Sequence, residues 1–342
     1  MLKLQLYFSI FLLGLTLVSC HEQKRADVSF YFWKTVYQEN KTAQMYLDSL
    51  DSKKMYIRMM DVDAGDAGPV PVSPVTFKTA VPAGIEVVPV VFIVNKVIQN
   101  QTHQQLDNLA GKIVYYVNGK IKQAGKTRFE ELQIDCDWTR TTRDNYFYLL
   151  TRIRANPSLK NKKISATLRL HQLKNQAGSG VPPADRVMLM CYNMGNLRKY
   201  GTQNSILDQD ELEKYAGKNL SRYPMPIDIG LPLFSWAVVF RHHLYTGISR
   251  GLNLGMLKDH KLFEELESSL YTLKQDMPAL ALKAGDEIRW EAITPENLES
   301  AAQYLQQYTI TNPVNIIYFH LDEKTLKPYP YETLEKTAAL FR

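Results

Sequence analysis

The stretch that decides the fold of this chain runs Leu132-Gln133-Ile134-Asp135-Cys136-Asp137-Trp138-Thr139. Apolar and polar residues alternate along it, which predicts a strand with one apolar face and one polar face. The apolar row is suited to packing beneath helices. The polar row carries two carboxylates, so we expect it to face the interior and the upper mouth of a barrel.

Seven further runs resemble this strand, and helical stretches separate them. The eight candidates are Val28–Trp33, Lys54–Asp61, Val87–Asn95, Glu131–Trp138, Lys163–His171, Arg186–Asn193, Ile229–Phe240 and Val314–Leu321. Strands that alternate with helices over this length predict an α/β fold, a single (β/α)8 TIM barrel. An open doubly wound sheet is the alternative, and it is less favoured because no glycine-rich phosphate turn follows the first strand.

Three segments lie outside this simple alternation. Lys112–Val117 is interpreted as an accessory strand or part of a linker. Long loops follow strands 6 and 7, at Asn196–Ile227 and Arg241–Glu291, and we expect the second to contain a helix around Leu262–Leu273. Loops after strands lie on the catalytic face of a TIM barrel, so these two are expected to wall a cleft.

The N-terminus indicates export. Lys3 precedes an apolar run that is too short to span a bilayer, and the run ends in Leu17-Val18-Ser19-Cys20. This resembles the lipobox of bacterial lipoproteins, with an ordinary secretory signal as the alternative. The resemblance implies a signal peptide at residues 1–19, palmitate or a similar lipid on Cys20, a lipidated tether at 20–27 and a barrel domain at 28–342. The expected location is the cell envelope, anchored to the bacterial membrane, with the outer membrane favoured, on the periplasmic or surface side.

Composition limits the other function classes. The chain is 45% hydrophobic and 22% charged, and its net charge of +6 is spread without long runs, so nucleic acid is not an expected partner. Cys136 and Cys191 lie in apolar runs and are interpreted as small buried hydrophobes. The 20 tyrosines and four tryptophans suit contacts with sugar rings.

Alignment of the strand ends gathers ionisable and aromatic side chains at the mouth. Asp135 and Asp137 lie there among basic as well as acidic residues. Charged groups that are partly desolvated need partners of opposite charge, and this set supplies them. The alternative is a set of buried ion pairs that only fills the lumen. The full set also contains Trp33, Arg58, Arg169, His171, Tyr192, Tyr318, His320 and Asp322.

The opening stretch resembles the fourth-strand signature of family 18 glycoside hydrolases, D-x-x-D-x-D-x-E, with Asp135 and Asp137 matching its second and third carboxylates. Met190-Cys191-Tyr192-Asn193 is similar to that family's Met-x-Tyr-Asp on the sixth strand. Thr139 stands where the family has its acid glutamate, Leu132 replaces the first aspartate, and Asn193 replaces the sixth-strand aspartate. A closer similarity is to an uncharacterised group of barrel proteins with an L-Q-x-D-x-D strand followed by a helix and an L-S-x-T strand, here Ile164-Ser165-Ala166-Thr167.

The resemblance implies a glycan as substrate or ligand and a glycoside hydrolase-like activity. Glycosidic cleavage needs two carboxyl groups, so we assign Asp137 as the acid or substrate-assisting group and Asp135 as the residue that holds its charge and orientation. A further carboxylate is sought at Asp61, Asp63, Asp322 or Glu291. The alternative is a noncatalytic glycan-binding or scaffold lipoprotein. Substrate contacts are assigned to Tyr192, Asn193, Arg58, Arg169, His171, Tyr318, His320 and Asp322.

Other chemistries have weaker patterns, and we expect no cofactor and no metal. Asp61–Gly68 resembles a calcium loop, but Gly65 and Asp66 are transposed relative to the EF-hand spacing. The mouth carries histidines and aspartates that suit a metal, yet no H-x-H or H-E-x-x-H spacing supports one. Trp236 and Trp290 are candidate glycan platforms, or core residues under the long loops.

Overall fold

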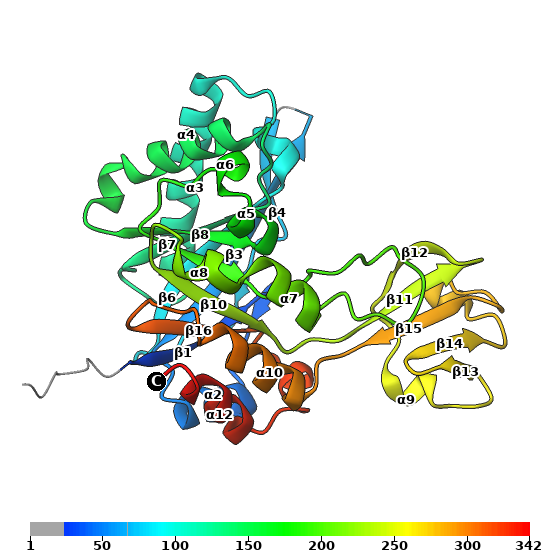
Figure 1. The fold of residues 1–342 in the computed structure, drawn as a ribbon. Coiled ribbons are helices and arrows are strands. Elements are labelled where there is room, and N and C mark those ends of the chain that lie inside the picture. Colours follow the sequence, from blue (N-terminus) through cyan, green and yellow to red (C-terminus); the bar gives the residue numbers. More distant parts are fainter. Residues whose placement is uncertain (1–23, 67) are drawn as a thin grey trace, which may run out of the picture.

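The computed structural model describes residues 24–66 and 68–342, and its centre is a closed parallel barrel (Figure 1). The strands follow the order β1-β16-β10-β9-β8-β7-β6-β3, and the pairing of β1 with β3 closes the ring. The predicted single TIM barrel is confirmed. Its strands are β1 (Ala26–Phe32), β3 (Lys54–Gly65), β6 (Glu86–Ile93), β7 (Glu131–Cys136), β8 (Lys163–Arg169), β9 (Arg186–Met190), β10 (Ile227–Pro232) and β16 (Val314–Phe319).

The proposed signal peptide and Cys20 lie outside the described residues. β1 begins at Ala26, so the last two residues of the predicted tether belong to the barrel. No helix within residues 24–66 and 68–342 is long and apolar enough to cross a membrane.

The short strand β4 (Gly68–Val72) pairs antiparallel with the end of β3, on the edge of β3 that faces away from β6, and the two strands form a hairpin.

Helices cover the outside of the barrel (Figure 1). The longest is α3 (His103–Gln123), which begins with a capping box formed by Thr102 and Gln105. The accessory strand predicted at Lys112–Val117 is therefore wrong, because these residues lie within α3. The buried residues of α3 recur every three or four positions from Leu106 to Ile121. The six residues Lys112–Val117 are too few to show this helical period.

The helix α4 (Arg143–Arg154) shows how the apolar row of β7 is used. Trp138 stacks on Tyr146 of this helix with ring centroids 5.0 Å apart, and the Tyr146 hydroxyl donates to the carbonyl of Ile134 over 3.0 Å. The apolar row therefore packs beneath α4. The remaining helices are α2 (Lys41–Ser49), α5 (Leu170–Lys174), α6 (Gln176–Ser179), α7 (Gln209–Tyr215), α8 (Gly217–Ser221), α10 (Pro295–Leu305), α11 (Glu323–Leu326) and α12 (Tyr331–Ala339).

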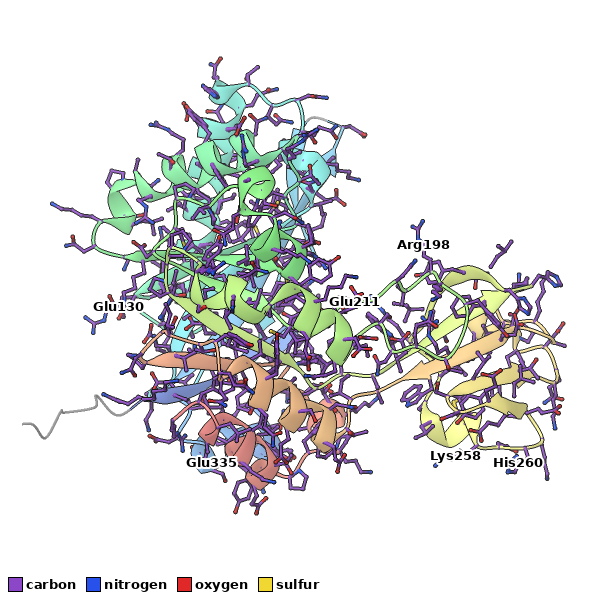
Figure 2. All side chains as sticks on the ribbon, viewed as in Figure 1. Glu130, Arg198, Glu211, Lys258, His260 and Glu335 are labelled. Carbon is purple, nitrogen blue, oxygen red and sulfur yellow. The ribbon has the colours of Figure 1, made fainter. Side chains whose placement is uncertain are left out.

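A second sheet is inserted between β10 and α10 and projects to the right of the barrel in Figure 1. This insertion is antiparallel in the order β12-β11-β15-β14-β13, and it buries a core of its own. The exposed residues Lys258 and His260 lie along its lower edge in Figure 2. Its elements are β11 (Trp236–Arg241), β12 (Leu244–Ser249), α9 (Leu254–Leu257), β13 (Phe263–Glu267), β14 (Leu270–Leu273) and β15 (Glu287–Glu291).

Two sequence-based predictions change because of this insertion. The predicted seventh strand, Ile229–Phe240, is divided between β10 in the barrel and β11 in the insertion. The helix predicted around Leu262–Leu273 is wrong, since this segment forms β13 and β14. Leucines at helical spacing among glutamates favoured a helix, but pairing with β15 overrides that local preference.

Candidate functional site

A cavity of about 160 Å³ opens at the carboxyl ends of the barrel strands. Asp61, Phe92 and Asp135 are register partners across β3, β6 and β7, so they lie at one level of the barrel. Asp135 and Asp137 both line the cavity, so the polar row of β7 faces the lumen. The cavity is bounded by Tyr31, Trp33, Phe92, Asp135, Asp137, Thr167, Arg169, Met188, Met190, Tyr192, Asn193 and Phe319.

Asp135 forms the deeper part of this site and is only 7% exposed. The Thr167 hydroxyl donates to its Oδ1 over 2.6 Å. Burial raises the pKa of the Asp135 carboxyl to about 7; the charge of Asp137 adds to this rise, while Thr167 and Arg169 oppose it. Near neutral pH this carboxyl can therefore either hold a proton or release it.

Asp137 lies nearer the rim and is held by Arg169 from the neighbouring strand. Arg169 Nε donates to Oδ1, and its Nη2 donates to Oδ2 over 2.6 Å, so the pair is bidentate. The Asp137 side chain is 39% exposed and the Arg169 side chain is 29% exposed. Both carboxylate oxygens of Asp137 thus have a charged partner while the pair remains open to solvent.

A second ion pair, Arg58–Asp61 on β3, lies beside the cavity and does not line it, so the predicted substrate contact at Arg58 is not placed in the cavity. Arg58 Nη1 donates to both carboxylate oxygens of Asp61, over 3.1 and 2.9 Å, and its guanidinium carbon lies 5.6 Å from the Trp33 ring centre. Burial raises the pKa of Asp61 although Arg58 opposes it. Asp63, two residues further on, pairs with Lys96 instead.

Aromatic rings connect the mouth to the insertion. Trp33 lies 5.4 Å from Phe319, and Phe319 lies 5.3 Å from Tyr192, measured between ring centroids. The series continues through Phe234 to Trp236, with separations of 6.2 and 5.2 Å. We call these five residues the aromatic row. Phe234 and Trp236 are half-buried, so the row keeps exposed ring surface beyond the cavity.

The expectation that Tyr318 faces the mouth is wrong. Tyr318 is fully buried, and its hydroxyl donates to the carbonyl of Leu334 in α12 over 2.6 Å. The inward row of β16 contains Phe319 and Asn315, and the Asn315 amide oxygen accepts from the Ser29 hydroxyl on the neighbouring strand β1. Alternation gave the wrong row, because Asn315 is the one polar residue within this strand and the prediction was guided by the polar residues that follow it, His320 and Asp322.

His320 and Asp322 follow β16 and do not line the cavity. Burial lowers the pKa of His320 to about 4, and its Nδ1 has no partner among the described residues. Asp322 caps α11 by accepting from the backbone N–H of Lys324 over 3.1 Å, and it pairs with Lys34. Both residues therefore lie beside the mouth rather than in it.

His171 borders a neighbouring cavity of about 230 Å³, which it shares with Tyr215 of α7. Arg169, Tyr192 and Asn193 line both this cavity and the mouth. Burial lowers the pKa of His171, and the charge of Arg169 acts in the same direction. The predicted contacts at these four positions thus belong to two adjoining hollows.

Thr139, at the position of the family's acid, and the candidate carboxylate Glu291 both lie away from the mouth. Thr139 is exposed, and its hydroxyl lies 3.0 Å from that of Thr141 in the turn that precedes α4. Glu291 is 2% exposed and accepts from Ser205 Oγ over 2.7 Å and from Trp236 Nε1 over 3.0 Å. Neither can present a proton in the cavity.

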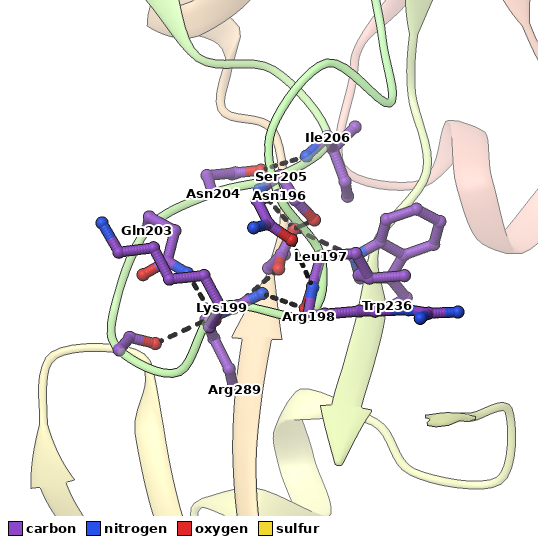
Figure 3. Close-up of polar contacts among 12 residues, drawn as sticks. Asn196, Leu197, Arg198, Lys199, Gln203, Asn204, Ser205, Ile206, Trp236 and Arg289 are labelled. Carbon is purple, nitrogen blue, oxygen red and sulfur yellow. Dashed lines mark hydrogen bonds and ion pairs between the residues drawn. The ribbon is translucent and has the colours of Figure 1, made fainter. Parts of the chain in front are cut away.

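Sequence reasoning missed Arg289, the partner of Glu291, which is fully buried at the base of the insertion (Figure 3). Its guanidinium donates to the carbonyls of Leu197, Lys199 and Gly201, over 3.1, 2.6 and 3.3 Å. The loop after β9 is thereby fastened to the insertion. The alternation Arg289-Trp290-Glu291 in a strand was the available signal, since it puts both charges on one face.

The cavity-lining residues Phe92, Thr167 and Phe319 were also missed as site residues. The alternation of side chains along β6 and β8, once these strands are aligned with β7, places Phe92 and Thr167 on the same face as Asp135, and this was the signal that would have found them. Within residues 24–66 and 68–342, no group of three or more His, Cys, Asp or Glu side chains is arranged to hold a metal ion.

No family model matches this chain, and no curated protein is similar to it in sequence. The C-terminal domain of a putative chitinase from Desulfitobacterium hafniense DCB-2 is similar in structure, with 9% identity over 94% of this chain and 100% of that chain and a TM-score of 0.56. The spore cortex-lytic enzyme SleL of Bacillus cereus has 12% identity, coverage of 93% and 75%, and a TM-score of 0.53.

A mutant of catalytic domain 2 of the Ostrinia furnacalis Group II chitinase, solved in complex with penta-N-acetylchitooctaose, has 11% identity, coverage of 92% and 96%, and a TM-score of 0.52. At these identities the likeness extends to the fold. The chain therefore shares the closed eight-stranded parallel barrel of chitinases and of a cortex-lytic enzyme.

Proposed function

We propose that this chain binds a glycan across the barrel mouth. One observation carries the proposal: aromatic rings and hydrogen-bonding carboxyl and guanidinium groups line a single cavity at the carboxyl ends of the strands. The half-buried rings of Trp33 and Phe319 offer flat apolar faces to sugar rings, while Asp137 and Arg169 offer partners to hydroxyl groups. The aromatic row extends beyond the cavity, which favours an oligosaccharide over a single sugar.

Recognition without family-type hydrolysis is the favoured form of this function. The position of the family's acid is occupied by Thr139, whose hydroxyl is directed towards Thr141. Asp137, which matches the third carboxylate of the family signature, has both oxygens engaged by Arg169. A side chain fixed by a bidentate pair is suited to binding but is not placed to deliver a proton.

Hydrolysis through Asp135 is the second candidate. The pKa of about 7 gives this carboxyl the protonation that a general acid needs near neutral pH. Asp61, which lies level with Asp135 in the barrel and contributes to its raised pKa, would act as the ionised partner. This assignment replaces Asp137 as the acid, and it retains the paired-carboxylate logic of glycoside hydrolases.

A glycan screen of the purified chain, scored for both binding and released sugar, tests the two candidates. Chitooligosaccharides are the first probes, followed by cell-envelope glycans. We expect binding without release, and we expect Trp33→Ala to weaken binding about tenfold or more through the lost ring face. Trp290, the other predicted glycan platform, packs against the core of the insertion and lies outside the aromatic row, so Trp290→Phe is the control and should leave binding unchanged. Release of sugar that Asp135→Asn abolishes would instead establish the hydrolase.

The proposal includes a membrane anchor at Cys20, which places the site in the cell envelope. Its support is the sequence alone: a short apolar run that ends in Leu17-Val18-Ser19-Cys20. Growth of expressing cells with an alkyne-labelled palmitate should label the chain. Cys20→Ser should abolish the label and release the protein from the membrane fraction, whereas labelling that persists in Cys20→Ser would contradict the assignment.

A further inference from the structure

A second cavity, of about 220 Å³, lies between the β3–β4 hairpin and helix α3. It shares no lining residue with the barrel mouth. It is a groove that opens to solvent, since Val70 is 38% exposed and Tyr115 is 83% exposed. Its lining residues are Met60, Val62, Pro69, Val70, Pro71, Leu109, Lys112, Ile113, Tyr115 and Tyr116.

The lining is apolar with one charged exception. Met60 and Val62 lie on β3, Val70 lies on β4, and Leu109 lies on α3, and all four present aliphatic groups. Among the described side chains that border the cavity, Lys112 alone is charged, and it is exposed. An apolar hollow with a single ammonium group at its rim is complementary to a molecule with an apolar tail and an anionic head.

We propose that this cavity binds the tail of a medium-chain fatty acid, with the carboxylate paired to Lys112. The volume equals that of about seven water molecules at roughly 30 Å³ each, and a methylene group is of similar size. A tail of about seven carbons, as in octanoate, therefore fills the hollow. The ligand is distinct from the glycan proposed for the mouth, and the two sites act independently.

Titration of the purified chain with butanoate, hexanoate, octanoate and dodecanoate tests the tail. Each methylene that enters the cavity should tighten binding about fourfold, and the gain should stop once the cavity is full, near octanoate. An affinity that does not depend on tail length would overturn the proposal. An affinity that rises without limit to dodecanoate would also overturn it, because a nonspecific apolar surface has no such ceiling.

Lys112 and the cavity wall are tested by substitution. Lys112→Met should weaken octanoate binding about threefold and leave octanol binding unchanged, while Lys122→Met, on the same helix and outside the cavity, should change neither. Val70→Phe fills the hollow from β4 and should reduce octanoate affinity at least tenfold. Leu109→Phe fills the hollow from α3 and should have the same effect. If thermal unfolding shows that one of the two variants is not folded, the octanoate affinity of the other variant tests the site. Full octanoate affinity in a folded filling variant would refute the site.

Discussion

The barrel mouth and the base of the insertion are built from the same parts and use them in opposite ways. Each has an arginine–carboxylate pair next to a tryptophan: Arg169–Asp137 beside Trp33 and Arg289–Glu291 beside Trp236. At the base the two charges are 0% and 1% exposed, and backbone carbonyls take the remaining arginine donors. At the mouth the charges stay partly in water, and the neighbouring Asp135 has capacity for a proton.

The difference teaches that residue type alone does not mark a functional ion pair. A pair whose donors and acceptors are all satisfied inside the protein has no capacity left for a ligand. A pair that is open on one side can exchange water for hydroxyl groups of a ligand without a large desolvation cost. The base is therefore interpreted as structural and the mouth as the binding site.

The largest expected effect is at the base. Arg289→Met leaves the Glu291 charge buried and three carbonyls without their donor, which should cost about 3–5 kcal/mol in the free energy of unfolding. Urea denaturation measures this loss. A cost below about 1 kcal/mol would mean that water reaches Glu291, and the contrast with the mouth would fail.

The next effect comes from Asp135 and depends on pH. Its folded-state pKa of about 7 lies above the ordinary value of 3.8, so folding favours the protonated form, and this contribution is complete below about pH 4 and is lost as pH rises through 7. The loss should approach roughly 4 kcal/mol, at about 1.4 kcal/mol for each unit of pKa. The free energy of unfolding of Asp135→Asn should accordingly equal that of the parent protein at pH 4 and exceed it at pH 8. Equal pH profiles would contradict the buried carboxyl.

A smaller effect is expected for the open pair. Arg169→Met removes a partly solvated partner of Asp137, so the free energy of unfolding should fall by less than about 1 kcal/mol. Glycan binding, measured by calorimetry with the probe found in the screen, should weaken clearly in the same variant. A stability loss as large as that of Arg289→Met would show that the mouth pair is structural as well.

The smallest effect is expected at Thr139. Thr139→Glu introduces the residue type that family 18 glycoside hydrolases have at the resembling position, but the side chain at this position projects towards the turn before α4. We expect no gain of sugar release and little change in stability, checked with a chitooligosaccharide assay and thermal unfolding. Strong release by this variant would show that the mouth is only one substitution away from hydrolysis.

Much of the barrel could be predicted because each strand has one face against helices, which leaves a clear alternation in β7 and β8. The parity of β16 was predicted wrongly, because Ile317 and Phe319 are as apolar as the outward Ile316 and Tyr318, and the single polar residue Asn315 was outweighed by the polar residues after the strand. The insertion was hidden for another reason: Leu262–Leu273 carries a helical spacing that only long-range pairing overrides. At the site, Asp135, Asp137, Arg169 and Tyr192 were placed at the mouth from sequence, whereas Phe319 and the Arg289 network required the fold.

The paired charges at the mouth have a consequence for how ligands approach. Arg58 is balanced by Asp61 and Arg169 by Asp137, so little electrostatic potential extends into the surrounding solvent. A ligand is then drawn in by short-range contact with rings and hydroxyl groups rather than by steering at a distance. Added salt, which screens long-range attraction, should hardly alter either the association rate or the affinity for an uncharged saccharide.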